Sequence, residues 1–199
     1  MSTGDVHLPA AFDRADIVSD EEIPTIDFGP FLDGDEASVT DALGAACRDI
    51  GFFYLTGHGV APDLIAAAFR QIRWYFAQPF AWKCELEATT DSYRGFFPAR
   101  EDTERNGIDG GSMEAFRLML DLPLDDPDVL AGTPLYGPNR WPADAPVFRS
   151  VMETYQRDVV ALATKLRQAL ALALGLDRNT FDQFFTKPLL NLQPAHYRG

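Results

Sequence analysis

Apolar and polar residues alternate along this chain with two periods, and each period predicts a different kind of element. Between residues 36 and 50, apolar side chains recur every three or four positions, which places these residues on one stripe of a helix: Val39, Leu43, Ala46, Cys47 and Ile50. The same spacing recurs from 62 to 76 and, over the longest stretch, from about 146 to 174. Gly51 and Gly175 follow the first and last of these segments and predict where the helices end. We therefore expect three main helices, of which the last and longest is the main structural support of the fold.

Short apolar runs between these helices predict strands. These runs are IPTIDF at 23–28, FFYLT at 52–56 and AFRLML at 115–120, of which FFYLT is aromatic and β-branched and too short for a helix. We expect FFYLT, which lies between glycines, to be buried. A last strand is expected within KPLLNLQPAHYRG at 187–199. Period two would give that strand one polar face, made of Asn191, Gln193, Ala195 and Tyr197.

Two segments show no period. Residues 1–22 are polar and acidic, and we expect a flexible arm there. Residues 81–112 include YRGFFP and the glycine-rich NGIDGGS, and a loop of this length is usually functional or mobile.

Composition narrows the class of protein. The chain has 199 residues, 46% of them hydrophobic, which suffices for one substantial domain or part of a larger one. Its formal net charge of −13 argues against nucleic acid or an anionic membrane as the main partner. Cys47 and Cys84 form no CxxC pair and predict two reduced thiols. No signal peptide or membrane-spanning run is evident, so we expect a cytoplasmic protein.

The stretch DIGFFYLTGHGV at 49–60 carries the most suggestive histidine. A strand followed by Gly57-x-Gly59 resembles a dinucleotide-binding turn, but Pro62 stands where the third glycine belongs. We instead expect Gly-His-Gly to form a tight turn in which the imidazole of His58 bonds a nearby backbone group.

Neither metal ligands nor a nucleophile can be assigned. A non-haem iron site needs two histidines and a carboxylate, commonly as His-x-Asp or His-x-Glu. The three histidine triplets begin at His7, His58 and His196, and none has an acid at its third position. No G-x-S-x-G occurs, and the acids are expected mostly on the surface. The polar face of the last strand could meet solvent or line a ligand cavity, and the sequence alone favours solvent.

Six segments in order carry a family resemblance: IPTIDF, CRDIGFFYLTGHGV, YRGFFP, SMEAFRLMLDLP, YGPNRWP and LLNLQPAHYRG. Across residues 23–199 the chain resembles the N-terminal half of the isopenicillin N synthase-like 2-oxoglutarate/Fe(II) oxygenases. The resemblance implies an α+β fold, in which a helical N-terminal region packs on the beginning of a double-stranded β-helix, or jelly roll, that is incomplete here. The implied division is an arm at 1–22, a non-haem dioxygenase N-terminal region at 23–187 and the first part of the jelly-roll domain at 188–199.

In that family, His-x-Asp and a distal histidine hold iron, and Arg-x-Ser binds the 2-oxoglutarate carboxylate. These motifs follow the strand represented by LLNLQPAHYRG, so the resemblance implies a truncated chain without catalytic residues or iron ligands. Fe(II) and 2-oxoglutarate are expected as cofactors of the intact enzyme, and neither should bind tightly to this chain alone.

The implied activity is hydroxylation or a related oxidation of a small organic substrate, with O₂ and 2-oxoglutarate as the other reactants and no nucleic-acid or membrane partner. Because the last strand lines the active-site cavity in relatives, Tyr197, Gln193 and Asn191 are candidate contacts for substrate or 2-oxoglutarate. Gln193 stands where the family often has arginine. Arg94 and Phe96 are weaker candidates for a substrate-side lid. The alternative is a non-catalytic interaction or scaffold protein that retains this half of the fold.

Overall fold

The computed structural model describes residues 23–90, 92–99 and 113–197. The three main predicted helices are confirmed as α2 (Ala37–Asp49), α3 (Pro62–Phe76) and α6 (Pro146–Ala173). The expected arm at 1–22 and the NGIDGGS segment lie outside the described residues.

The ends of α6 follow from its sequence. Pro146 occupies the first turn, where its missing N–H costs no helical hydrogen bond. At the other end, Gly175 takes the left-handed φ of 72°. The N–H of Gly175 donates to Leu172 at 2.8 Å, and the N–H of Leu176 donates to Ala171 at 3.0 Å. These bonds satisfy carbonyl groups that the last turn leaves without helical partners, so the predicted stop at Gly175 is confirmed.

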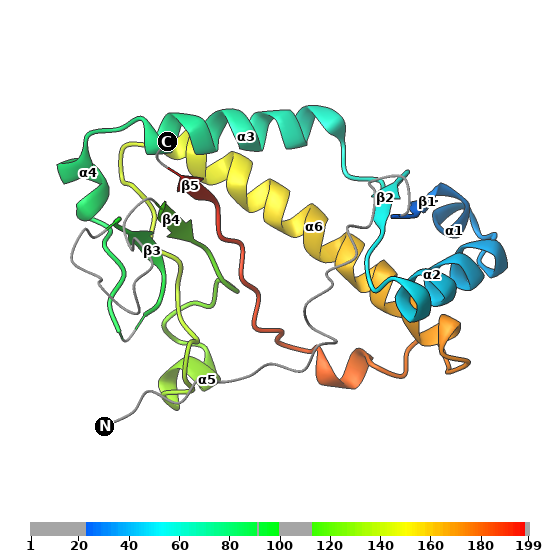
Figure 1. Ribbon diagram of the computed structural model, residues 1–199. Coiled ribbons are helices and arrows are strands. Elements are labelled where there is room, and N and C mark those ends of the chain that lie inside the picture. The colour runs from blue at the N-terminus through cyan, green and yellow to red at the C-terminus, as the bar shows by residue number, and fades with distance from the viewer. Residues whose placement is uncertain (1–22, 91, 100–112, 198–199) are drawn as a thin grey trace, which may run out of the picture.

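The strands form two separate sheets. β1 (Thr25–Asp27) and β2 (Tyr54–Thr56) pair in parallel. β3 (Gly95–Phe97), β4 (Met113–Arg117) and β5 (Ala195–Tyr197) form an antiparallel sheet in the order β3-β4-β5. The two sheets lie at opposite ends of the molecule, joined by α3 and α6 (Figure 1).

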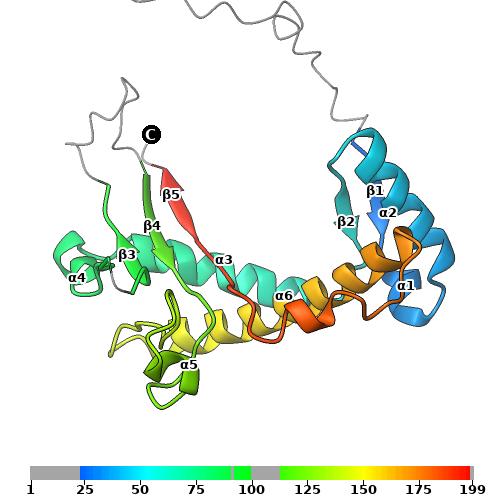
Figure 2. The ribbon, with the colours of Figure 1, turned by 90° about the horizontal axis from the view of Figure 1, so that it is seen from below.

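Two apolar cores share α6. The sheet-side core packs α3 and the N-terminal part of α6 against β3 and β4, through Ala68, Tyr75, Phe76, Phe96, Phe116, Leu118, Ala145, Phe148 and Met152. The N-terminal core surrounds β1 and α2 and includes Ile26, Phe28, Phe31, Val39, Leu43, Ala46 and Ala169. Because α6 contributes to both cores, it couples the two ends of the molecule, as Figure 2 shows.

Two expectations about burial were wrong. β2 is not fully buried: Phe52 and Tyr54 are 72% and 54% exposed, whereas Phe53 and Leu55 pack on the N-terminal core. The strand belongs to a two-stranded sheet with one face outward, so its residues alternate between core and solvent. Cys47, placed by its spacing on the apolar stripe of α2, is exposed, and both cysteines are free thiols.

The segment 81–112 contains more regular structure than its composition indicates. α4 (Phe80–Cys84) enters it, and β3 lies within YRGFFP. Further short helices occur at α1 (Gly29–Asp33), α5 (Pro127–Leu130) and η3 (Asp182–Phe184). Elements of three to five residues are too short to display a period.

As predicted, the Gly-His-Gly segment forms a tight turn in which the imidazole of His58 bonds a backbone group. Nδ1 of His58 accepts a hydrogen bond of 3.1 Å from the N–H of Val60. Gly57 has a φ of 59°, and a Cβ there would collide with Oδ1 of Asp27. That oxygen is already held by the N–H of Gly29 at 3.0 Å. The turn therefore fits closely against the end of β1 and leaves no space for a side chain at Gly57.

Candidate functional site

The two faces of the β3-β4-β5 sheet differ in chemistry. The inner face turns Phe96, Phe116 and Leu118 into the sheet-side core. By the strand register, the opposite face carries the remaining residues of the ladder, among them Phe97, Arg117, Gln193 and Tyr197. We call this the outer face. Figure 2 shows that β5 is the strand of this sheet nearest to the β1-β2 end of the molecule.

Arg117 and Gln193 form a fixed pair on the outer face. Oε1 of Gln193 accepts hydrogen bonds from Nε of Arg117 at 2.9 Å and from Nη2 at 2.5 Å. The Arg117 guanidinium carbon lies 4.6 Å from the ring centroid of Phe97 and 5.9 Å from that of Tyr93. The two hydrogen bonds and the ring contacts fix the plane of the guanidinium.

The inner face contains a buried ionic cluster. Nζ of Lys83 donates to Oε2 of Glu114 at 2.7 Å and to the carbonyl of Phe76 at 3.0 Å. Oε1 of Glu114 lies 3.0 Å from Nδ1 of His196, whose ring stacks on Phe76 at 5.5 Å. The side chains of Lys83 and Glu114 are only 4% and 2% exposed. The cluster thus connects α4, β4 and β5 beneath the outer face.

Sequence reasoning missed this cluster because it assigned the acids to the solvated surface. One signal was available: Glu114 alternates with Phe116 and Leu118, which period two places on the same face as the core. An acid at such a position requires a buried partner, since an unpaired buried charge is very costly.

Tyr75 lies close to the same cluster. Its buried hydroxyl has no hydrogen-bond partner in the described part of the chain. Burial, with a smaller contribution from Glu114, raises the pKa of Tyr75 far above its ordinary value. Tyr75 therefore stays neutral, and its ring packs against Phe116 at 4.6 Å.

The structure brings together part of the predicted site. Gln193 and Tyr197 lie on the outer face, and Tyr197 is 69% exposed. Asn191 is exposed just before the bridge that joins Leu192 to Leu118. The contact of these residues with substrate or 2-oxoglutarate stays a prediction.

Arg94 and Phe96 lie elsewhere, in the interior. Arg94 is 1% exposed and donates to the carbonyls of Ser92 and Leu120, both at 3.1 Å. Burial lowers its pKa, and Asp121 partly opposes that effect. Phe96 is fully buried in the sheet-side core. Both side chains support the fold in this arrangement, and their role as a lid stays a prediction.

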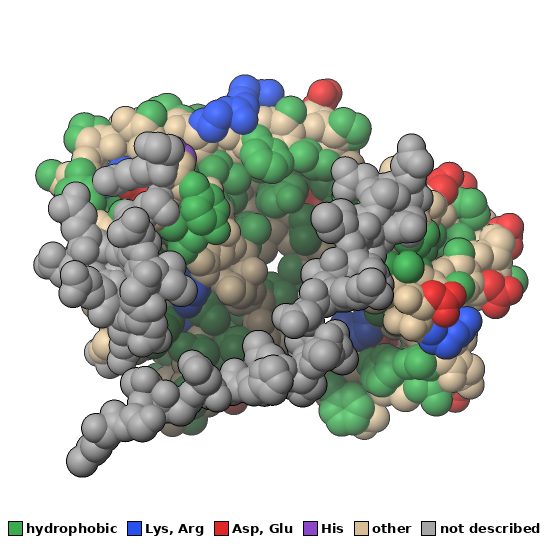
Figure 3. Space-filling view, viewed as in Figure 1, with side chains coloured by type: hydrophobic (Ala, Val, Ile, Leu, Met, Phe, Trp, Pro, Cys, Tyr) green, Lys and Arg blue, Asp and Glu red, His purple; other side chains and the backbone are tan. Residues whose placement is uncertain are grey.

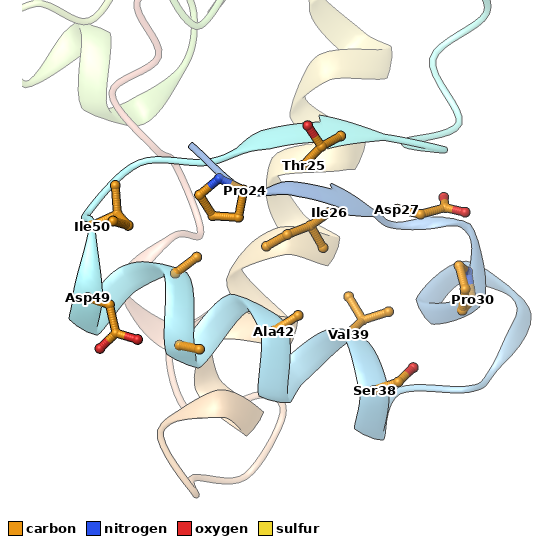
Figure 4. Close-up of a pocket in the computed structure, with 12 residues that line it drawn as sticks. Pro24, Thr25, Ile26, Asp27, Pro30, Ser38, Val39, Ala42, Asp49 and Ile50 are labelled. Carbon is orange, nitrogen blue, oxygen red and sulfur yellow. The ribbon is translucent and has the colours of Figure 1, made fainter. Parts of the chain in front are cut away.

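The molecule is hollowed between its two ends, and hydrophobic side chains line the visible part of the hollow (Figure 3). A separate cavity of about 580 Å³ lies between β1 and α2, lined mainly by apolar side chains such as Ile26, Val39 and Ala42 (Figure 4). Asp27 and Asp49 lie at its margins, far apart along the groove. This cavity offers no convergent polar groups for catalysis.

The described residues were also expected to lack iron ligands. No group of three or more His, Cys, Asp or Glu side chains within residues 23–90, 92–99 and 113–197 could hold a metal ion. The described residues therefore do not fit an iron centre. No helix among them is long and apolar enough to cross a membrane.

Comparisons with known proteins agree on the fold. The structure superimposes on a 2OG-Fe(II) oxygenase family protein from Caulobacter crescentus with a TM-score of 0.77, at 24% identity, over 88% of this chain and 56% of that one. It also matches full-length Neurospora crassa T7H in complex with alpha-KG and thymine, with a TM-score of 0.73, at 26% identity, over 90% of this chain and 57% of that one. The fold is that of the 2-oxoglutarate/Fe(II) oxygenases.

The sequence comparisons define the family. A family model described as the N-terminal region of non-haem dioxygenases in morphine synthesis matches residues 23–144. Clavatol oxidase claD of Penicillium crustosum is 30% identical, over 88% of this chain and 57% of its own length. The 2-oxoglutarate-dependent dioxygenase citB of Monascus ruber is 29% identical, over 88% of this chain and 55% of its own length. This chain belongs to the isopenicillin N synthase-like 2-oxoglutarate/Fe(II) oxygenase family, and it spans little more than half the length of these relatives.

Proposed function

We propose that this chain is the N-terminal part of an Fe(II)/2-oxoglutarate-dependent oxygenase that hydroxylates, or otherwise oxidises, a small organic substrate. The family match supports this proposal, together with relatives that are named as dioxygenases and oxidases. They do not favour the alternative of a non-catalytic scaffold.

Within that enzyme, we assign β5 to the beginning of the jelly roll and the outer face of the β3-β4-β5 sheet to a wall of the substrate pocket. The observation that carries this assignment is the Arg117–Gln193 pair, a preorganised polar group beside aromatic rings on a face turned away from the core. Binding pockets commonly combine apolar walls with a few fixed polar groups. The division at 187/188 between helical region and jelly roll is part of this proposal.

The iron ligands are proposed to lie outside these 199 residues, because the sequence has no His-x-Asp or His-x-Glu and the described residues offer no ligand cluster. When bound, Fe(II) and 2-oxoglutarate would supply the oxidation. The residues of this chain would bind and orient the substrate and exclude water from it.

The test is conversion of 2-oxoglutarate to succinate by the protein encoded by the complete reading frame, with Fe(II) and O₂. We expect Fe(II)-dependent succinate formation that is accelerated by one or more small organic molecules in a substrate panel. Absence of succinate from a folded, iron-loaded protein would contradict the proposal.

Tyr197→Ala and Asn191→Ala test the wall itself. Both are expected to raise the KM for substrate or 2-oxoglutarate, whereas Phe184→Ala, at an exposed position on η3, should leave both constants unchanged. Unchanged kinetics in both wall variants would remove those residues from the pocket.

A further inference from the structure

We propose that Arg117 is the anchor for a carboxylate group of the organic substrate, in an anion-binding subsite on the outer face of the β3-β4-β5 sheet. This substrate class rests on the proposed function, but the binding of a carboxylate at Arg117 does not require turnover.

Arg117 is a cation in an acidic chain, which carries 30 acidic against 17 basic residues. Within the described residues, several cations form salt bridges with carboxylates: Lys83, Arg149, Arg157, Arg167, Arg178 and Lys187. Arg117 is half-buried, and its side-chain hydrogen bonds within the described chain go to the neutral amide of Gln193. Its positive charge is therefore not compensated by direct contact with an acid among these residues.

The N–H donors of Arg117 that Gln193 does not use point along one edge of the guanidinium. A guanidinium carries five N–H groups in one plane. Gln193 takes the edge formed by Nε and Nη2, which leaves Nη1 and the remaining N–H of Nη2. Those two nitrogens form the terminal edge of the group, which matches the two oxygens of a carboxylate by parallel hydrogen bonds. Gln193 thus positions Arg117 without neutralising it.

The surroundings of Arg117 also indicate what the rest of the ligand would be. Phe97 and Tyr93 place aromatic rings beside the guanidinium, so a ligand bound to its free edge also meets apolar surface. No second cation accompanies Arg117 among the contacts of the described residues, which favours a singly charged carboxylate over a phosphate. The fitting ligand is a small organic acid with a planar or apolar body.

The test uses benzoate and its neutral isostere benzamide as probes, with dissociation constants from NMR titration of the protein encoded by the complete reading frame. We expect benzoate to bind about tenfold more tightly than benzamide, since hydrogen bonds between a guanidinium and a carboxylate are stronger than those to a neutral amide. Arg117→Gln should reduce this ratio to about one. Arg70→Gln, on the exposed side of α3, is the matched control and should retain it.

Folding of each variant is checked by its thermal unfolding midpoint. Should Arg117→Gln fail to fold, two other variants test the same proposal. Arg117→Lys keeps the positive charge but loses the paired N–H groups of the guanidinium, and Gln193→Leu removes the hydrogen bonds that hold the guanidinium in place. Both should give intermediate ratios. An unchanged ratio in a folded Arg117 variant, or no preference for benzoate in the unmodified protein, would overturn the proposal.

The KM for 2-oxoglutarate shows whether Arg117 binds the carboxylate of the organic substrate or that of 2-oxoglutarate. We expect Arg117→Gln to change the KM for 2-oxoglutarate less than about twofold while the benzoate preference is lost. A tenfold rise in that KM with an unchanged benzoate preference would assign Arg117 to the cosubstrate and overturn the proposal. If benzoate discrimination depends on Arg117 but no succinate forms, the anchor stands and only the proposed reaction fails.

Discussion

At the scale of single residues, a tight steric constraint lies at Gly57, where the Gly-His-Gly turn meets the end of β1. The sequence predicted that His58 serves the backbone, and its hydrogen bond with Val60 confirms this. The close approach of Asp27 could not be predicted, because it depends on the parallel pairing of β1 and β2, two strands separated by α1 and α2.

Gly57→Ala should destabilise the protein by about 3 kcal/mol or more. The substitution adds a collision with Asp27 to the cost of the left-handed φ, which alone is roughly 1–2 kcal/mol. Gly132→Ala is the matched control, since Gly132 has a φ of 70° but no atom within 4 Å of the added Cβ. If urea unfolding shows that the two variants lose equal free energy of unfolding, the collision with Asp27 adds no cost and the prediction is wrong.

The buried pair of Lys83 and Glu114 yields a second prediction at this scale. Glu114→Gln should lower the free energy of unfolding by about 3 kcal/mol, because it leaves the Lys83 ammonium buried without its counter-charge. Glu153→Gln, which breaks the exposed pair with Arg149, should cost no more than about 0.5 kcal/mol. A double variant, Lys83→Met with Glu114→Leu, should recover much of the loss. No recovery in the double variant would show that the cost is not one of uncompensated charge.

At the scale of elements, periodicity predicted α2, α3 and α6 within a residue or two, because each is long enough to repeat its apolar stripe. It could not predict α1, α4 or α5, which have four or five residues and are fixed by contacts distant in sequence. On the outer face, too, contacts between residues distant in sequence could not be predicted. The polar side of the last strand was visible in the sequence, but Arg117, its partner on β4, became evident only from the strand pairing.

The tether between α5 and the segment after η3 predicts a dependence on pH. Nζ of Lys187 donates to Asp126 at 2.9 Å and also contacts Asp128. The hydrogen bond that Lys187 donates to Asp126 lowers the pKa of Asp126, and the bonds that Lys187 donates to Asp128 and Asp126 raise the pKa of Lys187. Asp126 therefore stabilises the fold above its unfolded pKa of about 3.9, and this contribution is lost as pH falls through its lower folded value.

Lys187→Met should reduce stability at neutral pH, and the difference from the unmodified protein should shrink below about pH 4, where the unfolded Asp126 becomes protonated. The difference should also shrink as pH rises through the raised pKa of Lys187. Lys165→Met, at an exposed position on α6, is the control and should change stability little at any pH. A loss in Lys187→Met that is the same at pH 3 and pH 7, measured by urea unfolding, would contradict the tether.

At the scale of the whole molecule, α3 and α6 hold a two-stranded sheet at one end and a three-stranded sheet at the other (Figure 2). The family could be predicted because six motifs occur in the right order, and the family match at residues 23–144 confirms it. The substrate could not be predicted, since it depends on side chains that only the folded sheet brings together. Arg117 and Gln193, separated by 76 positions, are the example.

We propose that these residues build a substrate wall and that the iron ligands lie elsewhere in the enzyme. The most direct test counts Fe(II) bound under anaerobic conditions with 2-oxoglutarate, in the isolated 199-residue chain and in the protein from the complete reading frame. On this proposal, we expect about one tightly bound Fe(II) per molecule of the complete protein and none above background in the isolated chain. Stoichiometric, tight Fe(II) binding by the isolated chain would contradict it.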